Sequence, residues 1–171
     1  MDILNSWSLK IAKEVTPDEI DLAPIMTQAF VKGGKARENL FYQEKKGALG
    51  GFGVSEIPTV FPWVLKAVAI TAPIISTMLA AIPHIKDFLS IVKNTLDIQK
   101  NIEQQKKSKT LPDDPYAPLK CAMDAISKEL QAIQIPQEQR DLIVYRVLCT
   151  LLEDPTGATQ FVQKIGEVAN G

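Results

Sequence analysis

The sequence predicts a mainly α-helical protein with a small strand–helix–strand element at its N-terminus. Two observations point to helices. Apolar residues recur every three to four positions over residues 85–96 and 119–168, and an almost uncharged stretch covers residues 57–85. A third observation, the alternation of apolar and polar residues between Trp7 and Val15, indicates a strand.

The composition is that of an ordinary globular chain. It has 171 residues, of which 46% are hydrophobic and 23% charged, and this suits one domain or two small ones. The formal net charge of −1 leaves no general basic field for nucleic acid. We expect three segments: a small α/β element over residues 1–46, a glycine-rich loop with a hydrophobic segment and an amphipathic helix over 47–109, and a C-terminal helical module over 110–171.

The N-terminal element is predicted from short-range patterns. Apart from Ala12, apolar side chains alternate with polar ones, as in a half-buried strand, at Trp7, Leu9, Ile11 and Val15. The run Thr16-Pro17-Asp18-Glu19 then has the form of a capping box, with Thr16 as N-cap and Glu19 bonding back to it. The helix that it opens extends to Phe30, and Pro24 could kink it. A second short strand is expected from Leu40 to Gln43.

The segment from Ile57 to Ile85 is the most informative part of the sequence. It contains 29 residues and a single charge, Lys66, and it follows a glycine-rich junction at Gly47–Gly53. Pro62 suits a helix start, whereas Pro73 should kink the helix interior. The apolar side chains that we take as candidate membrane or oligomer contacts are Phe61, Trp63, Leu65, Val68, Ile70, Ile74, Ile75, Met78, Leu79 and Ile82.

Two interpretations of this segment stay open. A membrane span needs about 20 mostly apolar residues, and the 19 uncharged residues from Ala67 to Ile85 nearly reach that length. Their alanine, threonine, serine and proline content makes insertion marginal and conditional. Alternatively, a helix that is apolar all round forms the centre of a bundle or an oligomer seam.

Lysines flank the segment in a way that fits the membrane interpretation. Lys66 could extend its ammonium group toward lipid headgroups. A basic cluster on the far side could face anionic lipid, at ~1 kcal/mol for each lysine near the surface. This cluster consists of Lys100, Lys106, Lys107 and Lys109.

The remainder of the chain is predicted to be helical. An amphipathic helix follows from Ile85 and becomes polar near Gln105. Three further helices are expected, separated by breaks at Pro136 and at Asp154–Gly157. Their apolar stripes run over residues 119–133, 142–152 and 161–168.

The sequence offers little for catalysis. His84 is the only histidine, and the two cysteines, Cys121 and Cys149, fall on apolar helical stripes, which favours free thiols. No pattern has the spacing of a zinc site or of a nucleotide-binding loop. We therefore expect a protein that is not an enzyme, without catalytic, metal-binding or cofactor-binding residues, without a recognisable small-molecule substrate and without a nucleic-acid partner.

The order of elements from Trp7 to about Leu96 resembles that of effector-associated components of bacterial conflict (anti-phage defence) systems. The resemblance comprises a short strand, a helix opened by Thr16–Glu19, a glycine-bearing loop ending near Gly53, and a hydrophobic helix from Ile57. It covers about half of the chain and contains no diagnostic motif. It implies a small non-enzymatic partner of an effector, often with a membrane-prone helix, and it assigns no functional residue.

These patterns lead to a functional prediction with one alternative. We predict a latent membrane-active, oligomerising and pore-forming subunit of a defence-type system, cytoplasmic and recruited to the inner membrane. Its partners would be a protein, a further copy of itself, or membrane lipid. Proteolysis is a candidate trigger, in a connector that holds Lys35, Arg37, Lys45 and Lys46. The alternative is a soluble helical adaptor whose apolar helix is a core or oligomer seam.

Overall fold

Helices account for all the regular structure in the part of the chain that the computed structural model describes, which is residues 2–41, 59–81 and 117–170. The first range contains α1 (Ile3–Val15), the short 3-10 helix η1 (Pro17–Glu19), α2 (Ala23–Lys32) and α3 (Gly34–Phe41). The second contains α4 (Phe61–Ile70) and α5 (Ala72–Ala81). The third contains α8 (Ala117–Leu130), α9 (Gln137–Glu153) and α10 (Pro155–Asn170).

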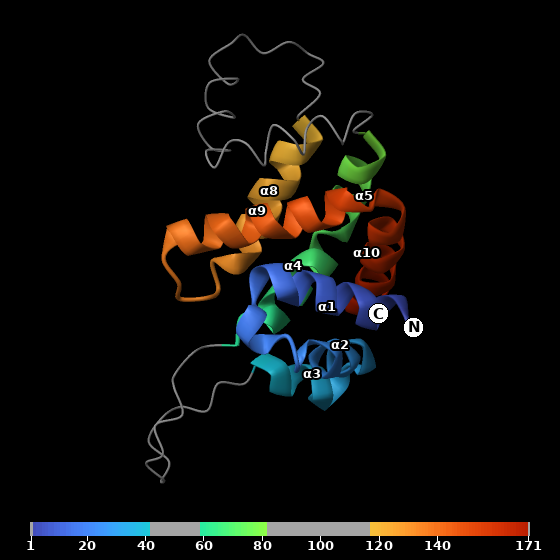
Figure 1. Ribbon diagram of the computed structural model, residues 1–171, viewed down its shortest axis with the longest axis vertical. Coiled ribbons are helices and arrows are strands. Elements are labelled where there is room, and N and C mark those ends of the chain that lie inside the picture. Colours follow the sequence, from blue (N-terminus) through green and yellow to red (C-terminus); the bar gives the residue numbers. More distant parts are fainter. Residues whose placement is uncertain (1, 42–58, 82–116, 171) are drawn as a thin grey trace.

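Helix α4 lies at the centre of this arrangement. Figure 1 shows α4 between the N-terminal helices α2 and α3 at one end and α5 with α8 at the other. Helices α2, α8 and α10 pack against α4, and α8 and α10 continue along α5. Helix α1 packs across α9 and α10. Helices α8 and α10 therefore cover α4 and α5, whereas α9 packs on α1, α8 and α10.

The expected strand from Trp7 to Val15 is wrong, because these residues belong to α1. A spacing of four residues fits both a strand of period two and a helix of period 3.6, so positions 7, 11 and 15 share one face in either structure. Ser8 and Ala12 are buried beside Trp7 and Ile11, as on the covered side of a helix. Asp2 caps this helix by accepting a hydrogen bond from the nitrogen of Leu4 at 3.3 Å.

The remaining N-terminal expectations are also corrected. Thr16 precedes η1 without a side-chain capping bond, and its hydroxyl is buried without a hydrogen-bond partner. Pro24 lies in the first turn of α2, where its missing N–H costs nothing, so it does not kink that helix. The expected second strand starts at Leu40, but Leu40 and Phe41 end α3, and Tyr42 and Gln43 lie outside the described residues.

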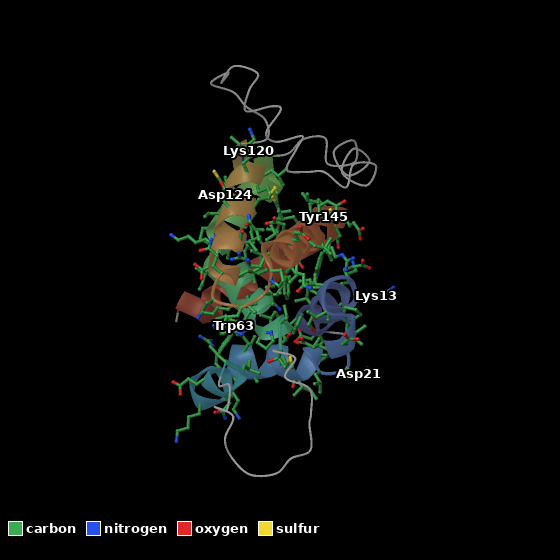
Figure 2. All side chains as sticks on the ribbon, turned by 90° about the vertical axis from the view of Figure 1, so that its left-hand side faces the viewer. Lys13, Asp21, Trp63, Lys120, Asp124 and Tyr145 are labelled. Carbon is green, nitrogen blue, oxygen red and sulfur yellow. The ribbon has the colours of Figure 1, made fainter. Side chains whose placement is uncertain are left out.

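A single hydrophobic core joins all three described ranges. Trp7 of α1 stacks on Phe161 of α10, with ring centroids 5.9 Å apart. Figure 2 shows charged side chains such as Lys13, Asp21 and Asp124 at the rim of the molecule, and these three are exposed. Helices α8 and α10 are apolar on one side only, and they turn that side toward α4 and α5, whereas α1 turns its apolar side toward α2, α9 and α10.

Candidate functional site

Helices α4 and α5, which we call the apolar helix pair, contain most of the candidate residues of the hydrophobic segment. Phe61, Leu65 and Val68 of α4 are fully buried, each with 0% of its surface exposed. Seven of the ten residues of α4 are buried, and the other three, Trp63, Lys66 and Ile70, lie on one side of the helix. The helix is apolar over most of its circumference because the rest of the chain covers that part of it.

Helix α5 is covered on one side only. Ile75, Met78 and Leu79 are buried, as the sequence pattern leads one to expect of a packed helix. Ile70 at the end of α4 and Ile74 in α5 remain 45% and 39% exposed. Together with other exposed, uncharged side chains they form what we call the exposed face, which consists of Ile70, Pro73, Ile74, Thr77 and Ala80. Ile82 lies outside the described residues.

The N-terminus of α4 is capped by a side chain from a distant part of the sequence. The carboxylate of Glu19 accepts hydrogen bonds from the backbone nitrogens of Val60 at 2.7 Å and of Phe61 at 3.0 Å. No side chain next to α4 caps it, so Glu19 supplies the acceptor that these N–H groups need. Its charge also suits the positive end of the helix dipole. The sequence places Glu19 in a local capping box, but the bonds join η1 to α4 instead.

Lys66, the only charge within the described part of the hydrophobic segment, lies against aromatic rings. Its ammonium group is 5.2 Å from the ring centroid of Trp63 and 5.3 Å from that of Phe41. Phe41 and Trp63 contact each other edge to face, with centroids 5.0 Å apart. Figure 2 shows Trp63 near the end of the molecule formed by α2 and α3. Cation–π contacts of this kind are worth ~0.5–1 kcal/mol at exposed sites, so Lys66 helps to fix α3 beside α4.

The apolar helix pair is bent. No single helix among the described residues has the length and apolar character to cross a membrane. The stretches Phe61–Ile70 and Ala72–Ala80 meet that criterion only together, and they are bent by 70°. The break falls at Thr71, two residues before Pro73, whose missing N–H and bulky ring prevent a regular helix across this point.

Helix α10 packs against the bend through a glycine. A Cβ atom added to Gly166 would lie 2.6 Å from the Cβ of Ala72 and 3.6 Å from the carbonyl oxygen of Ala69. Only a residue without a side chain therefore fits against both α4 and α5 at this point. Gly166 is not among the residues predicted from the sequence, although a glycine inside the apolar stripe of the last helix is a signal of close helix approach.

Of the expected cleavage connector, the structure describes Lys35 and Arg37, both in α3. Lys35 is exposed. Arg37 is partly buried, and it donates to the carbonyl oxygens of Phe30 at 2.8 Å and of Val168 at 2.9 Å. Arg37 therefore joins α3 to α2 and α10. Lys45 and Lys46 and the basic cluster at Lys100, Lys106, Lys107 and Lys109 lie outside the described residues.

Titratable groups do not converge on a reaction centre in the described ranges. No group of three or more His, Cys, Asp or Glu side chains in those ranges is arranged to hold a metal ion. The one resolved shift concerns Tyr145 of α9, where burial, followed by the neighbouring Cys149, raises the pKa to about 12. His84 lies outside the described residues. The side chains around α4 are apolar and aromatic, and Glu19 makes polar contacts at its N-terminal end.

Comparisons with protein-family models, with curated proteins and with solved structures find no match for this chain.

Proposed function

We propose that the protein is a non-enzymatic, latent membrane-active subunit, and that the apolar helix pair is the segment that enters lipid when the helices around it move away. The observation that carries this proposal is a nearly uncharged pair of helices that is largely covered by the one-sided helices α8 and α10. In lipid, the pair would occupy the hydrocarbon region. The apolar sides of α1, α8 and α10 would then lie at the interface.

The energetics support a protein that inserts conditionally. On insertion scales, Phe, Val, Leu and Ile each contribute only ~0.3–0.6 kcal/mol, whereas one lysine near the centre of a span costs ~2.5–3.5 kcal/mol. Lys66 lies in the first of the two helices, and prolines lie near the start of both. Insertion is therefore close to balance, and the core contacts of the folded chain keep the pair masked until a trigger weakens them.

The setting of this proposal comes from the resemblance to effector-associated components of bacterial conflict systems. We propose a cytoplasmic subunit that is recruited to the inner membrane, where it oligomerises into a pore. The order of elements behind the resemblance starts with a strand, and that position is occupied by α1. The experiment that follows therefore measures membrane binding alone and does not depend on the link to defence systems.

The test uses vesicles and a matched pair of variants. The intact protein, before and after limited trypsin digestion, is mixed with dye-filled vesicles of phosphatidylethanolamine and phosphatidylglycerol, and flotation and dye release are measured. We expect digestion to produce binding and leakage.

Ile74→Lys should reduce both, because it places a charge within the pair at a position that is exposed in the folded chain. Leu142→Lys is the control, since Leu142 of α9 is equally accessible at 41% and lies outside the pair. Absence of binding and leakage under every condition removes the proposal.

A second function, that of a helical adaptor that self-associates, is favoured by the exposed face. This face carries no charge and presents two large aliphatic side chains, Ile70 and Ile74. We propose a second copy of the chain as its occupant. The face is short, so the association should be weak and dependent on concentration.

Light scattering across a range of protein concentrations tests this second function. We expect the mass to rise with concentration for the natural sequence and for Leu142→Glu, but not for Ile74→Glu. A mass that stays at one chain for the natural sequence at all concentrations contradicts it. Val68 is unsuitable as a probe of such a seam, because it is fully buried and a charge there would unfold the protein.

A further inference from the structure

The break at Thr71 divides the apolar helix pair into two arms that are each too short to cross a membrane. Each arm has ten residues, and ten helical residues extend over about 15 Å, half of the ~30 Å hydrocarbon thickness. A continuous helix from Phe61 to Ala81 would extend over about 31 Å and would match that thickness. We propose that the 70° bend at Thr71–Pro73 is a conformational brake, and that straightening of this bend is the step that commits the pair to lipid.

This inference rests on the proposed membrane function and specifies what controls it. In the folded chain α10 packs against the bend, where Gly166 approaches Ala69 and Ala72, and α8 also packs against both arms. Helix α10 packs along both arms. Departure of α10 and α8 would remove the surfaces against which both arms pack, while Pro73 would still disfavour a regular helix.

The polar groups near the bend are already suited to a lipid environment. The hydroxyl of Thr71 donates to the carbonyl oxygen of Ala67 at 2.6 Å, and the hydroxyl of Thr77 donates to that of Pro73 at 2.9 Å. Both bonds lie within the pair, so they survive when the pair leaves the core. Since unsatisfied polar groups are costly in hydrocarbon, these bonds lower the barrier to insertion at the bend. Prolines are tolerated in membrane helices for a similar reason, because neighbouring groups satisfy the freed carbonyl.

A distance measurement tests the brake directly. Spin labels are attached at Thr59→Cys and Ala80→Cys, after Cys121→Ser and Cys149→Ser remove the natural thiols. Two arms of about 15 Å at the observed bend place the labelled backbone positions about 25 Å apart, and a straight helix places them about 32 Å apart. The protein is mixed with phosphatidylglycerol vesicles in urea just below its unfolding midpoint, and flotation of the same sample measures the bound fraction. We expect the longer distance in the vesicle-bound fraction alone.

A proline variant supplies an independent measurement. Pro73→Ala should increase the vesicle-bound fraction about tenfold or more near the threshold of binding, because an interior proline strongly disfavours a continuous helix. Pro24→Ala is the control, since Pro24 lies in the first turn of α2 and should leave binding unchanged. Thermal melts of both variants check that they remain folded.

The outcomes separate the brake from the function on which it rests. Binding of the labelled protein with an unchanged short distance overturns the brake and leaves the membrane function standing. Equal binding of Pro73→Ala and the natural sequence, with both folded, also overturns the brake. No binding by any variant overturns the membrane function and the brake together.

Discussion

Glu19 and Val60 are 41 positions apart in the sequence, yet the Glu19 carboxylate lies 2.7 Å from the Val60 backbone nitrogen. The contact fixes the entry to the central helix α4 from a short turn that belongs to the N-terminal part of the fold. Helix formation at residue 61 therefore depends on packing between distant segments. Removal of the Glu19 carboxylate should therefore change the free energy of unfolding measurably.

Glu19→Ala should lower the free energy of unfolding by about 1–2 kcal/mol, the usual cost of losing a helix N-cap. Urea unfolding followed by circular dichroism measures the change. Asp18→Ala, an exposed acidic residue of the same turn, is the matched control and should have little effect. If the two variants are equally stable, the bonds from Glu19 to α4 do not contribute to the fold.

Gly166→Ala should destabilise the protein by about 1–3 kcal/mol, because the added methyl group overlaps Ala72 where α10 crosses the bend. Ala72→Gly in the same chain should restore part of the loss by removing the atom that clashes. A double-mutant cycle from thermal or urea unfolding gives the coupling energy between the two positions. Purely additive effects would show that α10 does not rest against Ala72.

Arg37→Lys should cost about 1–2 kcal/mol of stability, since a lysine cannot donate to the carbonyl oxygens of Phe30 and Val168 at the same time from the same geometry. Arg37 also lies over the ring of Phe30, 4.8 Å from its centroid, and a lysine packs there less well. Lys35→Ala is the control, because Lys35 is exposed on the same helix. Unfolding midpoints that are unchanged for Arg37→Lys would contradict this joining role.

The stability of the protein should fall as the pH rises from 10 to 12. The pKa of Tyr145 is raised from 10.0 to about 12, chiefly by burial, so the folded chain holds the phenol proton more tightly than the unfolded chain does. The unfolded state then binds fewer protons in this window, and the free energy of unfolding decreases with pH. The contribution is fully present below pH 10. Unfolding curves at pH 9, 10, 11 and 12 should show a steeper decline for the natural sequence than for Tyr145→Phe, and equal slopes would refute this role.

The sequence by itself determined that the chain is mainly helical and that residues 61–81 need cover from water. The apolar stripes after Ala117 recur at helical spacing over long runs, and such runs fit only one period, so α8, α9 and α10 occur where the sequence predicts helices. The candidate residues Phe61, Leu65, Val68, Ile75, Met78 and Leu79 are all buried. A nearly uncharged segment has no other way to avoid water within a folded chain.

Only the tertiary structure decided the N-terminal helix, the cap on α4 and the side of α5 that remains exposed. The apolar positions of α1 are four residues apart, a spacing that two kinds of secondary structure share, and burial of Ala12 against other helices resolves the choice. The partner of Glu19 and the close approach at Gly166 depend on which distant helices meet. Ile74 and Ile75 are both isoleucines of one helix, yet one is exposed and the other is buried. Local sequence sets the period of a helix, whereas packing between helices sets which of its sides is covered.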